Sequence, residues 1–311
     1  MRLKIVVAAS SHEDTHAWAG AFASAHPSIE FIAYSSDRAG VGADYAIVWS
    51  PPPALFAQEQ RLKAVFNLGA GVDRLLAMRG LPTDLPVIRL EDAGMATQMA
   101  EYVLHGLADV SRGFGRYRAA QESGQWTPAQ AIDYGEWPVG VMGLGAIGSE
   151  VAQAVAQRGY PTAGWSRTGR SLPGIKTYEG VELAAFLTRT RVLVNVLPLT
   201  DATRDILDRR HLGLLQRGGY LINVARGAHV VDDDLLALID AGHLQGALLD
   251  VFRQEPLPCD HPYWLHPNVK ITPHISAITV RRNTIEQVLR KVDALERGHG
   301  VSGIVPRSRG Y

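Results

Sequence analysis

Short apolar runs alternate with longer amphipathic stretches along the whole chain. Runs in the first third are "LKIVVAA", "IEFIAY", "YAIVW", "AVFNLG" and "VIRL", and later runs are "VGVMG", "PTAGW", "RVLVNVLP", "GYLINVA", "GALLDVF" and "VKIT". Continuous Val, Ile and Leu are typical of strands buried on both faces. Their alternation with helical segments favours parallel sheets joined by right-handed crossovers. The pattern therefore predicts an α/β fold.

Three helices can be placed from their end signals and spacing. In "VVDDDLLALIDAG", Asp232–Asp234 stand where carboxylates meet free helix amides, and Gly242 is suited to termination. A long helix is predicted after Gly94, with Gly113 and Gly115 weakening any continuation. The last is "ITVRRNTIEQVLRKVDALERG", which has apolar residues at helical spacing.

The later strands predict one complete cofactor-binding sheet. They span roughly residues 139–275, the length of a doubly wound nucleotide-binding domain. The residues that follow are too few for a further domain. We therefore expect a discontinuous substrate-binding domain, 1–98 plus 276–311, with an inserted NAD(P)-binding domain, 99–275.

Composition narrows the functional classes. The chain has 311 residues, 46% hydrophobic and 20% charged, as in a globular protein of about two domains. Its formal net charge is +0 with no dense Lys/Arg block, which disfavours nucleic-acid binding. A single cysteine, Cys259, excludes an intramolecular disulfide. The N-terminus does not read as a signal peptide, and no apolar run has membrane-spanning length. We expect a soluble cytoplasmic protein that binds neither nucleic acid nor membrane.

The stretch "VGVMGLGAIGSEVAQAVAQRG" reads as a strand, a G-x-G-x-x-G turn and a helix. Gly143 allows a tight turn, Gly145 lets backbone approach a pyrophosphate, and Gly148 permits close helix–strand packing. The helix start at Ala146 and Ile147 would present amides and a positive dipole to the phosphates. A glycine triplet alone is weak evidence, but this context favours cofactor binding.

Residues that could bind a ligand or take part in catalysis also follow other predicted strands. These positions are Ser166 and Arg167, Leu197 and Pro198, Ala225 and Arg226, Glu255, and His274, with Trp49 and the "GAGVD" turn in the first domain. Ligands of open parallel sheets bind beyond the carboxyl ends of the strands. Two such edges facing one another would form an interdomain cleft.

The segment "GWSRTGR" predicts the cofactor type. NAD-binding sheets often carry an acid after the second strand, where it accepts hydrogen bonds from ribose hydroxyls. Here Ser166 stands at that position and Arg167 follows, so the segment can donate to a 2′-phosphate. We therefore predict NADPH, with NADH weaker. Arg170 is a second candidate, or a solvated loop residue.

The motifs "GLGAIG", "INVARG", "LLDVFRQEPLP" and "TPHIS" resemble, in order and spacing, the D-isomer-specific 2-hydroxyacid dehydrogenase family. The resemblance covers essentially the whole chain. Within the family, "VWSPP", "LGAGVD", "WSRT" and the ending "RGY" are most similar to its glyoxylate/hydroxypyruvate reductase A branch. The resemblance implies a flavodoxin-like lobe and a Rossmann-type lobe with a cleft between them, and it also implies a homodimer.

The resemblance also implies roles for individual residues. Arg226 would bind the substrate's carboxylate and carbonyl oxygen, His274 would be the general acid, and Glu255 would orient His274. The backbone of Gly69, Ala70 and Gly71 would hold the substrate carboxylate. Asp250 would lie near the nicotinamide carboxamide. The family's "TPHIAG" is "TPHISA" here, which leaves the catalytic residues intact.

Several alternatives stay open. Trp49 is either a core residue or, beside the rigid "PPP", part of a cleft wall for a small substrate. The leading function is NADPH-dependent reduction of glyoxylate to glycolate and hydroxypyruvate to D-glycerate, without a metal. The alternatives are a broader 2-keto-acid reductase and a nucleotide-sensing binding protein on the same fold.

Overall fold

The computed structural model describes residues 2–129 and 131–311, which fold into two compact units. Unit 1 comprises the chain up to Gly94 together with Thr279–Tyr311, and unit 2 is Met95–Ile278. The sequence predicts boundaries at 98/99 and 275/276, whereas these units divide at 94/95 and 278/279. The first boundary lies earlier because helix α4, Met95–Arg112, belongs to unit 2 from its first residue.

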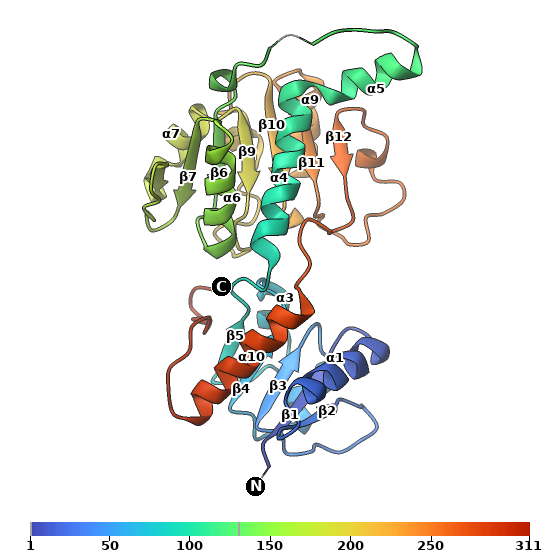
Figure 1. Ribbon diagram of the computed structural model, residues 1–311, viewed down its shortest axis with the longest axis vertical. Coiled ribbons are helices and arrows are strands. Elements are labelled where there is room, and N and C mark those ends of the chain that lie inside the picture. Colours follow the sequence, from blue (N-terminus) through green and yellow to red (C-terminus); the bar gives the residue numbers. More distant parts are fainter. Residues whose placement is uncertain (1, 130) are drawn as a thin grey trace. The chain divides into compact units, whose positions relative to one another are not determined.

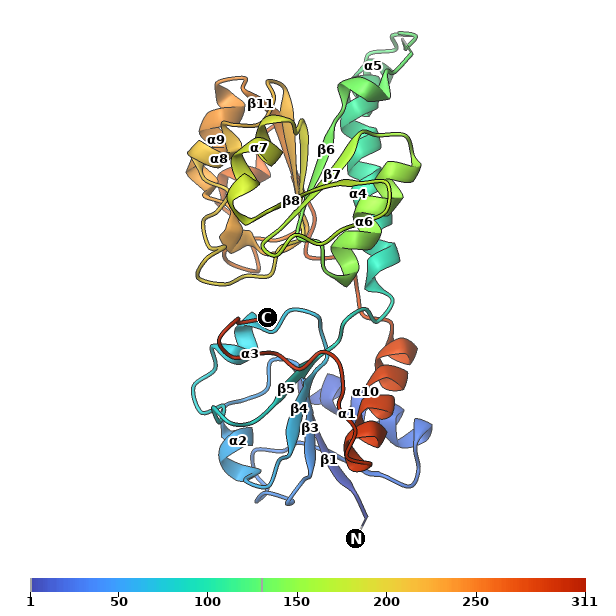
Figure 2. The same cartoon turned by 90° about the vertical axis from the view of Figure 1, so that its left-hand side faces the viewer.

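Unit 1 contains a five-stranded parallel sheet of order β2-β1-β3-β4-β5. Its strands are β1 Lys4–Ala8, β2 Glu30–Ala33, β3 Tyr45–Val48, β4 Ala64–Asn67 and β5 Val87–Arg89. Its helices are α1 His12–Ala25, α2 Ala54–Gln58, α3 Asp73–Leu76 and α10 Arg281–Glu296. Helices α1 and α10 cover one face of the sheet and α2 and α3 the other (Figure 2).

The C-terminal segment is tied to the β5 edge of unit 1. The Arg89 amide donates to Gly303 O over 2.9 Å, and the Val305 amide donates to Val87 O over 2.8 Å. On α10, the buried Lys291 ammonium donates to Arg89 O over 3.2 Å. These bonds complete the first sheet with residues from the far end of the chain.

Unit 2 contains a seven-stranded parallel sheet of order β12-β11-β10-β9-β6-β7-β8 (Figure 1). Its strands are β6 Val139–Met142, β7 Thr162–Ser166, β8 Lys176–Glu179, β9 Val192–Asn195, β10 Gly219–Asn223, β11 Leu244–Leu249 and β12 Val269–Ile271. The strand order reverses between β6 and β9. The predicted doubly wound α/β architecture is therefore confirmed.

Helices cover both faces of the second sheet, which explains its uninterrupted apolar strands. The helices are α4, α5 Phe114–Glu122, α6 Ala146–Gln157, α7 Leu183–Thr188, α8 Arg209–Leu212 and α9 Asp232–Asp240, and the short 3-10 turns are Tyr134–Glu136, Gly180–Glu182, Gly227–His229 and Pro262–Trp264. One face packs against α4 and α6, and the other against α7, α8 and α9 (Figure 2). No described helix combines the length and apolar character that crossing a membrane requires.

One strand of this sheet was not predicted from the sequence. Strand β8 has the sequence KTYE, and only Tyr178 of its four residues is buried. It lies at the sheet edge, where charged residues protect unpaired backbone groups from aggregation. An edge strand of this kind lacks the apolar run by which the other strands were recognised.

Candidate active site

The sheet of unit 2 brings the predicted loops to one edge. All its strands are parallel, so the segments after β6, β7, β9, β10, β11 and β12 leave at the same, carboxyl-terminal, edge. These segments carry the predicted cofactor-binding and catalytic residues. The two central segments, after β6 and β9, flank the point where the strand order reverses, which is where such sheets bind ligands.

The glycines of the first loop have distinct structural roles. Gly143 has φ +99°, a region that side chains rarely adopt. A Cβ atom at Gly148 would lie 1.8 Å from Gly143 O, so the helix can pack this closely only without a side chain. At Gly145, by contrast, no described atom outside its chain neighbours lies within 4 Å of the added Cβ, and no hydrogen bond from a described side chain caps α6. Open space and uncapped helix amides at Ala146 and Ile147 fit a phosphate group.

The second loop of the sheet holds the residues proposed to select the cofactor. Ser166 ends β7, and its Oγ accepts a hydrogen bond from the Arg170 amide over 3.1 Å. Arg167 is exposed on the turn. The Arg170 guanidinium donates to Leu144 O, inside the glycine turn, over 3.1 Å. Arg170 thus connects the turn to the "GWSRTGR" loop, a geometry that spacing alone did not reveal.

Glu255 and His274 meet directly, although they are 19 residues apart in sequence. His274 Nδ1 and Glu255 Oε2 are 2.9 Å apart, and the other carboxylate oxygen accepts the Phe252 amide over 3.0 Å. The carboxylate can only accept, so Nδ1 carries a proton and Nε2 remains for proton transfer. His274 has φ +57°, the left-handed region, in which histidine is enriched among residues other than glycine.

Asp250 holds the His274 loop in this strained shape. Its side chain is fully buried and accepts from Thr272 Oγ1 over 2.6 Å and from the Ile275 and Ser276 amides over 2.8 Å each. Its backbone oxygen accepts the His274 amide over 2.8 Å. Asp250 therefore fixes the loop on both sides of the histidine. Its role beside the nicotinamide stays a prediction.

Arg226 lies on a loop that packs directly on the Glu255 loop. The next residue, Gly227, has no room for a side chain, because a Cβ there would lie 1.9 Å from the carbonyl carbon of Phe252. The Phe252 amide in turn donates to Glu255. This contact joins the segments of Arg226, Glu255 and His274 into one packed cluster. The Arg226 guanidinium also donates to Ala225 O over 2.7 Å.

In unit 1, the predicted substrate residues form a second group. A Cβ at Gly69 would lie 2.4 Å from the Trp49 ring, so the indole packs against the glycine backbone. The side-chain amide of Asn67 donates to Gly69 O and Gly71 O, 2.9 Å each, and shapes the turn through Ala70. Trp49 is 40% exposed, which contradicts the core alternative. Its place in a cleft wall stays a prediction.

The residues that support the His274 loop were not predicted from the sequence. Tyr102 on α4 is 2.5 Å from Thr272 Oγ1, which itself donates to Asp250, so the phenol is the donor to Thr272. Burial, together with the nearby Asp250 carboxylate, raises the pKa of Tyr102 to about 12. The hydroxyl stays protonated through the neutral range. A tyrosine in an amphipathic helix gives no sequence signal of this contact.

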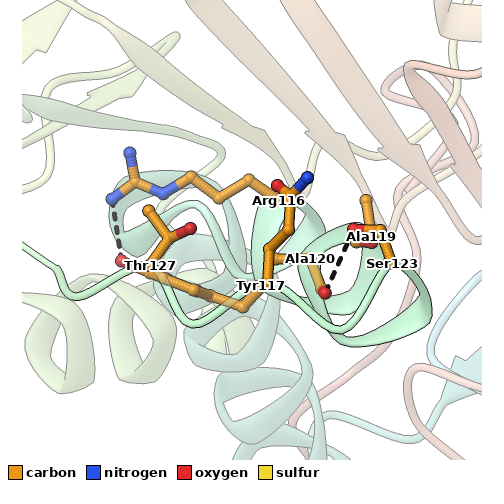
Figure 3. Close-up of a pocket in the computed structure, with 7 residues that line it drawn as sticks. Arg116, Tyr117, Ala119, Ala120, Ser123 and Thr127 are labelled. Carbon is orange, nitrogen blue, oxygen red and sulfur yellow. Dashed lines mark hydrogen bonds between the residues drawn. The ribbon is translucent and has the colours of Figure 1, made fainter.

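A separate pocket lies away from these loops, on α5 and the segment that follows it (Figure 3). Its volume is about 270 Å³, and its seven lining residues lie between Arg116 and Thr127. Arg116 donates to the Tyr117 hydroxyl over 2.9 Å. None of the predicted site residues lines this pocket. Within the described part of the chain, no group of three or more His, Cys, Asp or Glu residues is arranged to hold a metal ion.

Comparison with known proteins places this geometry in context. Residues 104–276 match the model of the D-isomer specific 2-hydroxyacid dehydrogenase, NAD binding domain, family. A D-isomer specific 2-hydroxyacid dehydrogenase from Xanthobacter autotrophicus Py2, solved with NADPH and MES, is 37% identical over 100% of both chains, with a TM-score of 0.93. An NADPH-dependent glyoxylate/hydroxypyruvate reductase from Sinorhizobium meliloti, solved with NADP and sulfate, is 35% identical over 99% of this chain and 100% of that one, with a TM-score of 0.93. A probable 2-hydroxyacid dehydrogenase from Rhizobium etli, solved with NADP, HEPES and L(+)-tartaric acid, is 32% identical over 100% of both chains, with a TM-score of 0.92.

Proposed function

Because the chain belongs to the D-isomer-specific 2-hydroxyacid dehydrogenase family, we propose that it uses NADPH to reduce small 2-keto acids, glyoxylate to glycolate and hydroxypyruvate to D-glycerate. The observation that carries the proposal is the hydrogen bond between His274 and Glu255 at the carboxyl edge of the cofactor sheet. The Sinorhizobium reductase, which resembles this chain along its whole length, supports the choice of substrates.

The residues of unit 2 fit a bound dinucleotide. The uncapped start of α6 and the open surface at Gly145 would receive the pyrophosphate. Backbone at Leu197, Pro198 and Ala225 would border the nicotinamide half. When bound there, NADPH would supply the hydride for the carbonyl carbon of the substrate. The protein must then supply a proton and stabilise charge.

The chain's own groups can meet both requirements. As hydride arrives, negative charge builds on the keto oxygen, and groups that stabilise it most in the transition state accelerate the reaction. His274 would donate the Nε2 proton to that oxygen, and Glu255 would stabilise the imidazolium before transfer. Arg226 would bind the carboxylate, and its guanidinium can do so through two parallel hydrogen bonds.

A keto-acid panel tests the substrate assignment. We expect kcat/KM for glyoxylate and hydroxypyruvate to exceed that for bulky keto acids such as phenylpyruvate. Preference for phenylpyruvate would instead identify a broader 2-keto-acid reductase. His274→Ala should abolish most turnover without weakening NADPH binding. If its turnover equals that of the wild type, the histidine is not the acid and a nucleotide-sensing role becomes the better account.

Preference for NADPH over NADH rests on Ser166 and Arg167. One charge-assisted hydrogen bond contributes about 1.5–3 kcal/mol, or roughly 10- to 100-fold in affinity. Arg167→Ala should reduce the NADPH/NADH ratio of kcat/KM by about this factor. Arg158→Ala, which removes an exposed arginine at the other end of α6, is the matched control and should leave the ratio unchanged. Equal use of both cofactors by the wild type would refute the assignment.

We also propose a homodimer. Helix α5 projects from the body of unit 2 (Figure 1). It buries none of its residues, and Trp126, in the segment after it, is 97% exposed. Tryptophan is enriched in protein–protein interfaces, so an almost fully exposed tryptophan on this segment supports an interaction surface here. Sedimentation of the wild type should give twice the mass of one chain, and Trp126→Ser should shift it toward the monomer. A wild-type monomer at micromolar concentration would contradict the proposal. Cytoplasmic location remains a prediction.

A further inference from the structure

Three fully buried polar side chains lie beneath the loops of the proposed site. Asn195 ends β9, Asn223 ends β10, and His229 closes the 3-10 turn that follows Arg226; each has 0% exposure. Asn195 and Asn223 are partners in register on adjacent strands. Burying polar groups is unfavourable unless they are hydrogen-bonded, so their partners define what they do.

Backbone groups fix the orientation of both asparagine amides. Asn195 Oδ1 accepts the Leu197 amide over 3.2 Å, which leaves its Nδ2 as the donor. Asn223 Oδ1 accepts the Ala225 amide over 3.2 Å and Asn195 Nδ2 over 3.0 Å. Asn223 Nδ2 then donates to Arg226 O over 3.0 Å.

The amide orientations determine the tautomer of His229. The second hydrogen of Asn195 Nδ2 points to His229 Nδ1 over 3.0 Å, so this ring nitrogen must accept. His229 Nε2 is 3.3 Å from Pro198 O, a carbonyl that can only accept, so this nitrogen must carry the hydrogen. The imidazole is therefore the neutral Nε2–H form.

The network ends on two of the predicted site loops. Arg226 O accepts from Asn223 Nδ2 and also from the His229 amide over 3.3 Å. Pro198 O, on the predicted cofactor loop, accepts from His229 Nε2 and also from Thr203 Oγ1 over 2.7 Å. The same three side chains thus hold the backbone that carries the substrate-binding arginine and the backbone that borders the cofactor.

We propose that Asn195, Asn223 and His229 are positioning residues that set the Arg226 and Pro198 loops together for the reductase reaction. The inference rests on the proposed function for its kinetic part. With apolar side chains at these three positions, Arg226 O would keep the His229 amide and Pro198 O would keep Thr203 Oγ1, but the bonds from Asn223 and the His229 ring would be lost. The buried polar side chains therefore add contacts that tie the two loops together, beyond filling space.

His229→Phe tests the proposal, since it keeps an aromatic ring but removes both ring nitrogens. His229→Gln is the conservative variant, because its amide offers one acceptor and one donor. Phe186→Leu is the matched control for stability: Phe186 is fully buried in the same unit, on α7, and packs toward Gly140 rather than toward the loops. Tm is measured for each variant, and the NADPH Kd and the KM for glyoxylate are then measured at temperatures below its unfolding range.

We expect His229→Phe to raise both the KM for glyoxylate and the NADPH Kd by about five- to tenfold, as loss of one aligned contact on each loop predicts. His229→Gln should restore both constants to within about threefold of the wild type. Phe186→Leu should lower Tm and leave both constants unchanged. Unchanged constants in His229→Phe, or an equal rise in Phe186→Leu, would overturn the proposal.

Histidine ¹⁵N NMR gives a readout that does not depend on turnover. The wild-type spectrum should show His229 protonated at Nε2 alone, with the signal assigned by its absence in His229→Gln. A ring protonated at Nδ1 would overturn the network. If the wild type reduces no keto acid, the proposed function fails, while the tautomer and the NADPH Kd still decide whether the network positions the Pro198 loop.

Discussion

Gly227 is the position at which one added methyl group should damage the candidate site most directly. A Cβ atom there would lie 1.9 Å from the carbonyl carbon of Phe252 and 2.3 Å from the Arg253 amide nitrogen. Ordinary van der Waals contact begins at 3.4 Å, so relieving the first overlap requires a backbone movement of about 1.5 Å. Neither neighbour is a flexible side chain that could turn aside.

The movement required in Gly227→Ala should reach Glu255 and His274. The Phe252 amide binds Glu255 Oε1, and Glu255 Oε2 binds His274, so displacement of Phe252 shifts the carboxylate. Misplacement by about 1 Å can cost about 100-fold in rate. Overpacking typically costs about 1–3 kcal/mol, and each kcal/mol lowers the Tm of a domain of this size by about 2–4 °C.

The assay is steady-state NADPH oxidation with glyoxylate, together with a thermal melt. We expect kcat/KM of Gly227→Ala to fall by about 100-fold at temperatures where the variant is folded. Gly20→Ala is the matched control: Gly20 lies in α1, and beyond the adjoining backbone of that helix no described atom comes within 4 Å of its added Cβ. Alanine there should stabilise the helix by up to about 1 kcal/mol. Activity of Gly227→Ala within threefold of the wild type would refute the proposed link between the two loops.

Two further predictions follow from hydrogen bonds outside the reacting groups. Tyr102→Phe removes the donor to Thr272, so we expect a stability loss of about 0.5–1.5 kcal/mol and a lower kcat/KM, measured by chemical denaturation and kinetics; an unchanged kcat/KM would show that Tyr102 does not support the His274 loop. Hydrogen bonds from Lys63 and Tyr45 lower the pKa of Glu296 in the folded state, so its carboxylate stabilises the fold above the unfolded pKa and this contribution is lost as pH falls through the folded value. Glu296→Gln should therefore reduce the free energy of unfolding at neutral pH by less than about 1 kcal/mol, because the pair is partly exposed, and should lower Tm accordingly. Near pH 3 the substitution should have little effect. An equal effect at both pH values would contradict the assignment.

The sequence predicted those parts of the fold that depend on local patterns. Apolar runs identified every strand of the described residues except β8, whose mostly exposed residues follow no apolar pattern. The three aspartates at the start of α9 and the left-handed glycine after it, Gly242, matched the observed helix end signals. Such features can be predicted because each depends on neighbouring residues in the chain.

Contacts between segments that are distant in the chain could not be predicted from the sequence. Strand ends located Glu255 and His274 at one sheet edge, but the direct hydrogen bond, and the contact of Gly227 with Phe252, depend on the loop backbones. The buried asparagines could have been noticed in the sequence. Asn195 and Asn223 are single polar residues within apolar runs, and each is the last residue of its strand. They stand opposite one another on neighbouring strands, where such residues can form a cross-strand pair.

The hydrogen bonds between β5 and the C-terminal segment have a consequence for synthesis on the ribosome. The edge of β5 is covered only when Gly303 and Val305 arrive, after all of unit 2 has been made. Unit 2 is continuous in sequence and can fold first, whereas unit 1 must bring together ends separated by that whole insertion. The β5 edge of the nascent first sheet therefore stays unpaired from the synthesis of β5 until the C-terminal segment emerges, and in that interval it can pair with other chains.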